Sequence, residues 1–133
     1  MKCFVTILSV ALIAGGALAI SEEQREAARQ MAAKCMKETG ATEEQVQRLR
    51  NGDTSNADSN TQCFVHCFFQ GAGFVDSNGN IQEDHLVERL STHYDRATAE
   101  ELVQRCRNNN GANGCERSFR LAQCYIDNRA SLM

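Results

Sequence analysis

Apolar residues recur along this chain at intervals of three and four, which is the spacing of one face of an α-helix. Six segments follow this pattern, and no stretch of useful length alternates between apolar and polar positions as a half-buried strand does. The chain has no proline, and glycine and asparagine stand in the turns between segments. The pattern predicts an all-α chain with helices over 21–40, 42–51, 58–71, around 86–90, 98–106 and 115–128.

Local signals mark the ends of the first two helices. Ser21 and Thr42 are each followed three residues later by a glutamine, Gln24 and Gln45, which is the capping-box pattern. Gly40 is expected to end the first helix. These signals place the first two helices directly one after the other.

The third helix is expected to be the central element. Its apolar positions run almost all the way round the helix, as they do in a helix that is buried on several sides. They are Cys63, Phe64, Val65, Cys67, Phe68 and Phe69.

The N-terminal residues have the layout of a secretory signal peptide. Lys2 precedes an apolar run from Cys3 to Ile13, and Ala17-Leu18-Ala19 forms a small-x-small cleavage site. We therefore expect residues 1–19 to be a signal peptide and residues 20–133 to be one domain. The apolar run is too short to span a bilayer. Removal of one lysine with the leader takes the formal net charge from −3 to −4. This mildly acidic surface disfavours nucleic-acid binding, and no later run predicts membrane insertion.

The cysteine count predicts a disulfide framework. Cys3 leaves with the signal peptide, so six of the seven cysteines remain in a small secreted chain. Six cysteines can pair in 15 ways. Cys63 and Cys67 stand four apart, where helical Cβ atoms lie about 5–6 Å apart, whereas a disulfide needs about 3.5–4.5 Å. Excluding that pair leaves 12 schemes. A zinc site is disfavoured because the chain has no CxxC pair.

Several catalytic and metal-binding motifs were considered, and none is present. The segment 76–80 resembles the start of a calcium loop, but Ile81 and Val87 occupy the positions that require glycine and glutamate. His66-Cys67 resembles a secreted phospholipase, yet Phe68 stands where that family has aspartate. The chain has neither a GxSxG nor an HExxH sequence. A small hydrolase is therefore disfavoured, and we expect no enzyme activity, cofactor or metal.

The cysteine intervals resemble those of a known family. Between successive cysteines lie 27, 3, 38, 8 and 8 residues. This spacing is similar to the six-cysteine signature of insect odorant-binding proteins, the pheromone and general odorant-binding family, and in particular of its dipteran members. The segments 48–53 and 74–80 also resemble those that follow the second helix and precede the fourth in that family. The resemblance spans Cys35 to Cys124.

The resemblance implies a compact six-helix, disulfide-stapled fold around an apolar ligand cavity. It implies the pairs Cys35–Cys67, Cys63–Cys115 and Cys106–Cys124, one of the 12 schemes left open above. It also implies a secreted extracellular carrier of small hydrophobic ligands, such as odorants or pheromones. A chemosensory receptor and a second copy of the chain are the other partners that this interpretation allows. The alternative is a non-sensory secreted protein with a packed core, acting in reproductive fluid or defence.

Candidate pocket residues are the apolar side chains on the facing helices. The C-terminal pair, Leu132 and Met133, is a candidate lid, because the family's tail can fold over the cavity. Of the three histidines, His66 on the central helix is the candidate for a pH-dependent switch of ligand affinity. Thr61, Gln62, Ser118 and Tyr125 are the polar side chains near these helices. The remaining candidates for the pocket wall are Met31, Met36, Val46, Leu49, Phe64, Val65, Phe68, Phe69, Leu86, Leu90, Val103, Phe119 and Ile126.

Overall fold

The computed structural model describes residues 21–55, 57–108 and 110–132, with side chains up to Asn128. The predicted signal peptide lies outside the described residues. Contacts divide the chain into two units, residues 1–31 and residues 32–133, which we describe separately. The described part of the first unit is the N-terminal portion of a single helix, α2. The second unit holds the rest of α2 and five further helices.

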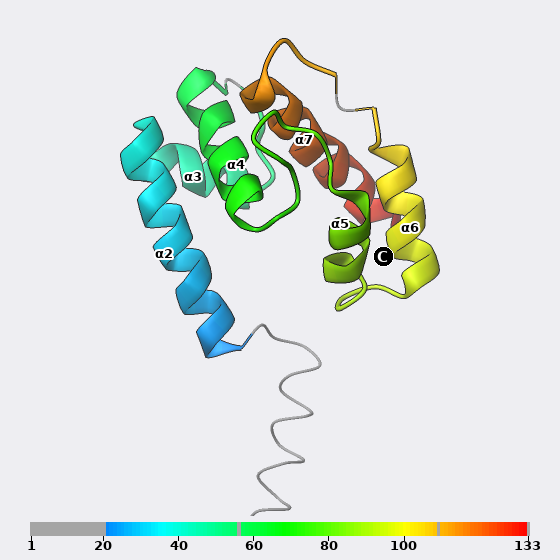
Figure 1. Ribbon diagram of the computed structural model, residues 1–133. Coiled ribbons are helices and arrows are strands. Elements are labelled where there is room, and N and C mark those ends of the chain that lie inside the picture. Colours follow the sequence, from blue (N-terminus) through cyan, green and yellow to red (C-terminus); the bar gives the residue numbers. More distant parts are fainter. Residues whose placement is uncertain (1–20, 56, 109, 133) are drawn as a thin grey trace, which may run out of the picture. The chain divides into compact units, whose positions relative to one another are not determined.

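The described residues form six helices, which confirms the all-α prediction (Figure 1). The one sheet-like pairing among them is an isolated antiparallel bridge between Val75 and Ile81. No described helix combines the length and the apolar character needed to cross a membrane. The helices are α2 (Glu22–Thr39), α3 (Glu43–Arg50), α4 (Ser59–Gly71), α5 (Glu83–Leu90), α6 (Arg96–Arg105) and α7 (Gly114–Leu132).

Both predicted capping boxes are present. The Thr42 hydroxyl accepts from the backbone N–H of Gln45, and the Gln45 side chain accepts from the backbone N–H of Thr42. Ser21 and Gln24 make the same reciprocal pair at the start of α2. These bonds satisfy backbone donors that a helix N-terminus otherwise leaves without partners. The sequence therefore fixes the starts of both helices locally.

Two helix ends differ from the sequence expectation. α6 begins at Arg96 rather than near Thr98, because the Asp95 carboxylate caps the helix by accepting from the backbone N–H of Thr98. α7 continues to Leu132 rather than ending near Asn128. The Asn128 side chain donates to the backbone carbonyl of Cys124 within the same helix, so it does not end the helix.

The core of the second unit lies among α5, α6, α7 and the segment 74–81 that precedes α5. In this unit α4 packs most extensively on α7, and α5 packs on α6. Burying a large aliphatic side chain contributes roughly 1.5–3 kcal/mol, so this cluster is the main apolar contribution to stability. Its buried members are Val75, Leu86, Val87, Ala99, Leu102, Val103, Cys106 and Leu121.

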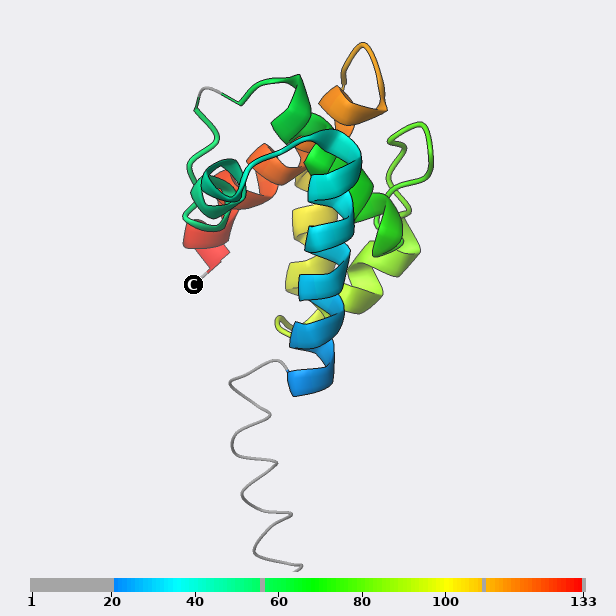
Figure 2. The ribbon, with the colours of Figure 1, turned by 90° about the vertical axis from the view of Figure 1, so that its left-hand side faces the viewer.

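The segment 74–81 forms a tight loop that lies beside the start of α7 (Figure 2). The Asp76 carboxylate accepts from the backbone N–H groups of Asn78 and Asn80. Gly79 has φ +82°, and a Cβ at this position would lie 2.8 Å from the backbone of Gly114. The loop can approach α7 this closely because neither position carries a side chain.

Candidate ligand-binding site

Three disulfides bind the helices around the central helix α4 to one another. Cys35–Cys67 joins the C-terminal part of α2 to α4, and Cys63–Cys115 joins α4 to α7. Cys106–Cys124 joins the end of α6 to α7. Their Cα–Cα distances are 5.7, 4.4 and 5.6 Å, and they are the same pairs that the family resemblance implies. The elements that carry the candidate pocket residues are thus covalently held.

The candidate wall residues divide into two groups by exposure. Half-buried side chains retain surface that a ligand can contact, whereas fully buried ones pack against protein atoms. The half-buried group is Met36, Leu49, Phe68, Phe69, Leu90 and Ile126. The buried group is Val46, Phe64, Val65, Leu86, Val103 and Phe119. Met31 belongs to the first unit. Met133 and the side chain of Leu132, the candidate lid, lie outside the described residues.

An aromatic surface borders the α5–α6–α7 core. Phe69 and Leu90 pack against this core, and Phe74 joins them. The rings of Phe69 and Phe74 meet edge to face, with centroids 5.6 Å apart, a favourable geometry for aromatic pairs. The helical spacing did not single out Phe74, because it lies in the turn after α4. Its position in an otherwise polar segment, followed by Val75, was the available signal.

A shallow hollow of about 340 Å³ opens on the second unit between the segment 54–57, α4 and α7. One candidate wall residue, Phe119, contributes to it. Polar side chains make up most of the lining, so this hollow differs in character from the apolar cavity that the resemblance implies. Its lining residues are Thr54, Ala57, Gln62, Glu116, Phe119, Arg120 and Gln123.

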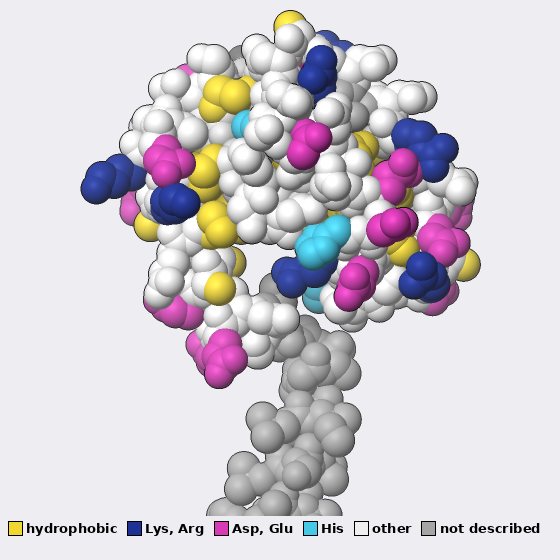
Figure 3. Space-filling model, viewed as in Figure 1, with side chains coloured by type: hydrophobic (Ala, Val, Ile, Leu, Met, Phe, Trp, Pro, Cys, Tyr) yellow, Lys and Arg dark blue, Asp and Glu magenta, His cyan; other side chains and the backbone are white. Residues whose placement is uncertain are grey.

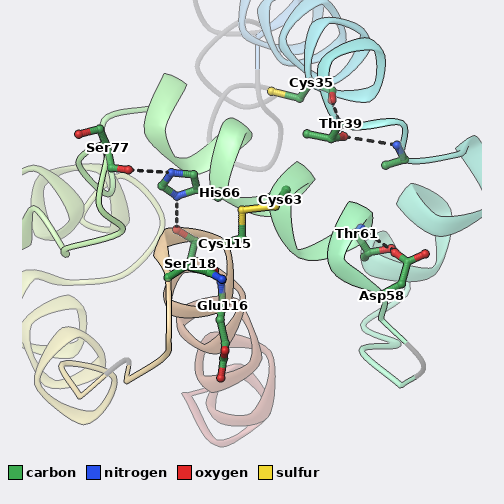
Figure 4. Close-up of a disulfide and its surroundings, with 12 residues drawn as sticks. Cys35, Thr39, Asp58, Thr61, Cys63, His66, Ser77, Cys115, Glu116 and Ser118 are labelled. Atoms are coloured by element: carbon green, nitrogen blue, oxygen red, sulfur yellow. Dashed lines mark hydrogen bonds between the residues drawn. A yellow bond between two sulfur atoms is a disulfide. The ribbon is translucent and has the colours of Figure 1, made fainter.

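His66 connects three parts of the second unit (Figure 4). Its Nδ1 lies 2.8 Å from the Ser118 hydroxyl on α7, and its Nε2 lies 3.2 Å from the backbone carbonyl of Ser77. Ser118 is completely buried. In the neutral ring, Nε2–H donates to Ser77 and Nδ1 accepts from Ser118. The candidate for pH dependence therefore lies at the junction of α4, α7 and the segment 74–81.

The hydrogen bonds around Asp76 also explain why its loop is not a calcium site. The backbone N–H of Asn80 is the largest cause that holds the pKa of Asp76 below its ordinary value, and the positive charge of His66 contributes least. Both carboxylate oxygens accept from groups within the loop. Within the described ranges, no cluster of three or more His, Cys, Asp or Glu side chains could hold a metal ion.

The face in Figure 3 carries apolar side chains in small separate patches among charged and polar ones. Most charged side chains on the described helices are exposed, including the i,i+4 ion pairs Arg48–Glu44 and Arg105–Glu101. Such exposed pairs contribute little stability each. On this face the chain therefore presents no large apolar surface to solvent.

Comparison with known proteins identifies the family. The PBP/GOBP family, which groups pheromone-binding and general odorant-binding proteins, matches residues 17–128. The chain belongs to this family.

Its relatives are insect proteins that are named for binding. The chain is 30% identical over 118 residues to general odorant-binding protein 56a of Drosophila melanogaster, covering 89% of this chain and 84% of that protein. A fatty acid binding protein, OBP56a, from the oral disk of the blowfly Phormia regina has a similar structure. The TM-score is 0.75 and the identity 30%, covering 86% of this chain and 99% of that one.

A second solved structure is also similar. It is odorant binding protein 7 from Anopheles gambiae, with four disulfide bridges and in complex with an azo compound. The TM-score is 0.70 and the identity 25%, covering 85% of this chain and 91% of that chain.

Proposed function

We propose that this chain is a secreted carrier that binds small hydrophobic ligands and moves them through aqueous extracellular fluid. The observation that carries the proposal is the half-buried apolar surface of Met36, Phe68, Phe69 and Leu90, held among helices that disulfides join. Membership of the PBP/GOBP family supports it. Burial of an apolar ligand against such a surface contributes roughly 25 cal/mol per Å² of apolar area removed from water.

The chemistry of the ligand is a separate part of the proposal. Relatives named for odorants and for fatty acids support a ligand with a substantial apolar portion. The half-buried side chains are aliphatic and aromatic, which suits dispersion contacts with such a portion. We propose no reaction for this site.

The test is a titration of the oxidised chain, residues 20–133, with an apolar fluorophore whose emission depends on its surroundings. Volatile compounds and fatty acids are then used to displace it. Saturable binding that small apolar molecules compete for is the expected result. If the fluorophore does not bind while all three disulfides are intact, the interior is packed, and the non-sensory alternative replaces the carrier.

Secretion and setting complete the proposal. We infer that residues 1–19 are removed on export, so the secreted protein is expected to begin at Ile20, which N-terminal sequencing checks. Delivery to a chemosensory receptor is the proposed setting. Staining of chemosensory tissue is the expected result, and staining confined to reproductive tissue contradicts this part alone.

A further inference from the structure

The two tyrosines of the chain meet in the folded second unit, although 31 residues separate them in sequence. Tyr94 lies in the turn between α5 and α6, and Tyr125 lies on α7. Their hydroxyl oxygens are 3.4 Å apart, and both side chains are half-buried. The turn and the helix thus place two phenol groups at one point of the molecule.

This point borders the aromatic surface described above. Tyr125 packs against the α5–α6–α7 core, as do Phe69, Phe74 and Leu90. The phenol rings therefore continue the apolar surface and add hydroxyl groups to it. A hydroxyl placed against apolar side chains is costly unless it forms a good hydrogen bond.

The geometry of the pair suits a third partner. Hydrogen bonds between hydroxyl groups are usually about 2.7–2.8 Å long, so the contact of Tyr94 and Tyr125 at 3.4 Å is a weak one. Each phenol has one proton, and a bond between the two hydroxyls uses only one of them. The other proton has to be donated to a third acceptor. An oxygen atom of a ligand is such an acceptor.

The other candidate polar side chains already have partners within the protein or lie elsewhere. The hydroxyl of the buried Thr61 donates to the Asp58 carboxylate, 3.0 Å away. The Ser118 hydroxyl is bound to His66. Gln62 lines the polar hollow instead. The tyrosine pair is thus the polar group that joins the aromatic surface.

We propose that Tyr94 and Tyr125 bind the polar end of the ligand by hydrogen bonds to an oxygen atom, while its apolar chain lies against Phe69, Phe74 and Leu90. The ligand class is then an apolar chain with a carbonyl or carboxylate oxygen at one end, rather than a plain hydrocarbon. This inference rests on the proposed carrier function and names the ligand class for it.

The experiment measures displacement of bound N-phenylnaphthylamine from the oxidised chain by dodecanal, dodecanoic acid and dodecane. It compares the native protein with Tyr94→Phe and Tyr125→Phe, which keep the ring and remove the hydroxyl. Each variant is expected to lose roughly 2- to 12-fold in affinity for the two oxygenated compounds, as the loss of one hydrogen bond predicts, and nothing for dodecane. Comparison of dodecanal with dodecanoic acid distinguishes a neutral carbonyl from a carboxylate.

A matched control removes a different hydroxyl near the same turn. Ser91 is half-buried, and its hydroxyl donates to the backbone carbonyl of Val87 within α5. Ser91→Ala is expected to leave the ratio of dodecanal to dodecane affinity unchanged. Equal losses for all three compounds in the tyrosine variants, or no loss, would overturn the inference and leave the carrier function standing. Failure of the fluorophore to bind the native protein overturns the carrier function instead.

A second readout needs no variant. The chain has two tyrosines and no tryptophan, so its intrinsic fluorescence comes from Tyr94 and Tyr125. Saturation with dodecanal is expected to change this emission more than saturation with dodecane. An emission that both compounds leave unchanged, although both displace the fluorophore, contradicts the proposed contact even if a phenylalanine variant fails to fold.

Discussion

The hydroxyl of Ser118 and Nδ1 of His66 lie 2.8 Å apart, although 52 residues separate the two in sequence. This hydrogen bond joins α7 to α4 at a fully buried position, next to the Cys63–Cys115 disulfide (Figure 4). His66 also holds the segment 74–81 through the backbone carbonyl of Ser77. One side chain thus sets the relation of three elements.

Removal of the Ser118 hydroxyl is expected to destabilise the protein. Ser118→Ala leaves Nδ1 of His66 without its buried partner, which costs about 1–3 kcal/mol. Urea denaturation followed by circular dichroism measures the change. Ser59→Ala is the control, because Ser59 is exposed at the start of α4, and such surface changes stay within about 0.5 kcal/mol. Equal stability of the two variants contradicts the prediction.

Ligand affinity is expected to fall between pH 7 and pH 5 through His66. The protonated imidazole donates from both nitrogens, so the Ser118 hydroxyl must rotate to accept, and the contact of α4 with α7 changes. The charged groups of the neighbouring loop and helix are Asp76 and Arg117. Fluorophore titrations at both pH values measure the affinity. His66→Gln is expected to reduce the difference, and the exposed His93→Gln to preserve it. Identical native affinity at both pH values rules out the switch.

Acid is expected to destabilise the fold through its capping aspartates. The backbone N–H of Thr98, followed by its side chain, lowers the pKa of Asp95, and Thr61 does the same for Asp58. Because the folded pKa lies below the unfolded one of about 3.9, the stabilisation is complete above that value and is lost as the pH falls through the folded pKa. Urea denaturation at pH 7 and pH 3 checks this. Asp95→Asn keeps a capping residue and is expected to narrow the difference, and an unchanged difference argues against it.

The disulfides are expected to differ in their contribution to stability. Cys63–Cys115 closes a loop with a sequence separation of 52, and Cys106–Cys124 one with a separation of 18. Loop-closure entropy predicts losses of about 4 and about 3 kcal/mol when each pair is replaced by alanine. Guanidinium denaturation of the two double variants measures both losses. A larger loss for the shorter loop would show that entropy of the unfolded chain does not set the order.

Gly79 is expected to tolerate alanine less well than Gly40. Both have positive φ, +79° at Gly40 and +82° at Gly79, so alanine pays about 1–2 kcal/mol of backbone strain at either site. Only at Gly79 would the new Cβ also meet backbone, the Gly114 Cα and O at 2.8 Å. At Gly40 the nearest atom belongs to the flexible Asn60 side chain, 3.4 Å away. Thermal unfolding of both variants compares them, and an equal loss means that the loop moves away from α7 without cost.

The helix starts could be predicted because caps are local. Ser21 with Gln24 and Thr42 with Gln45 act within four residues, so the sequence alone contains the interaction. The end of α7 could not be placed in this way. Asn128 can end a helix or bond back into it, and the structure has it bonded to the backbone of Cys124.

The apolar content of the site was predictable, but its polar contacts were not. Periodicity placed Phe69 and Leu90 at the interior surface, where the structure has them half-buried. The bond between His66 and Ser118 depends on how α4 and α7 pack, and no local signal sets that register. Tyr94 was missed because it lies in a turn, outside the helical pattern.

The placement of the disulfides determines what happens if the backbone is cut between α6 and α7. The segment 107–113 lies between Cys106 and Cys115, and the exposed Arg107 offers a trypsin site there. Cleavage after Arg107 leaves Cys63 and Cys106 on one fragment and Cys115 and Cys124 on the other. Two bonds, Cys63–Cys115 and Cys106–Cys124, then cross the cut. A protein nicked there keeps α7 attached and separates into two pieces only under reducing conditions, so in oxidising fluid this cut alone does not release α7.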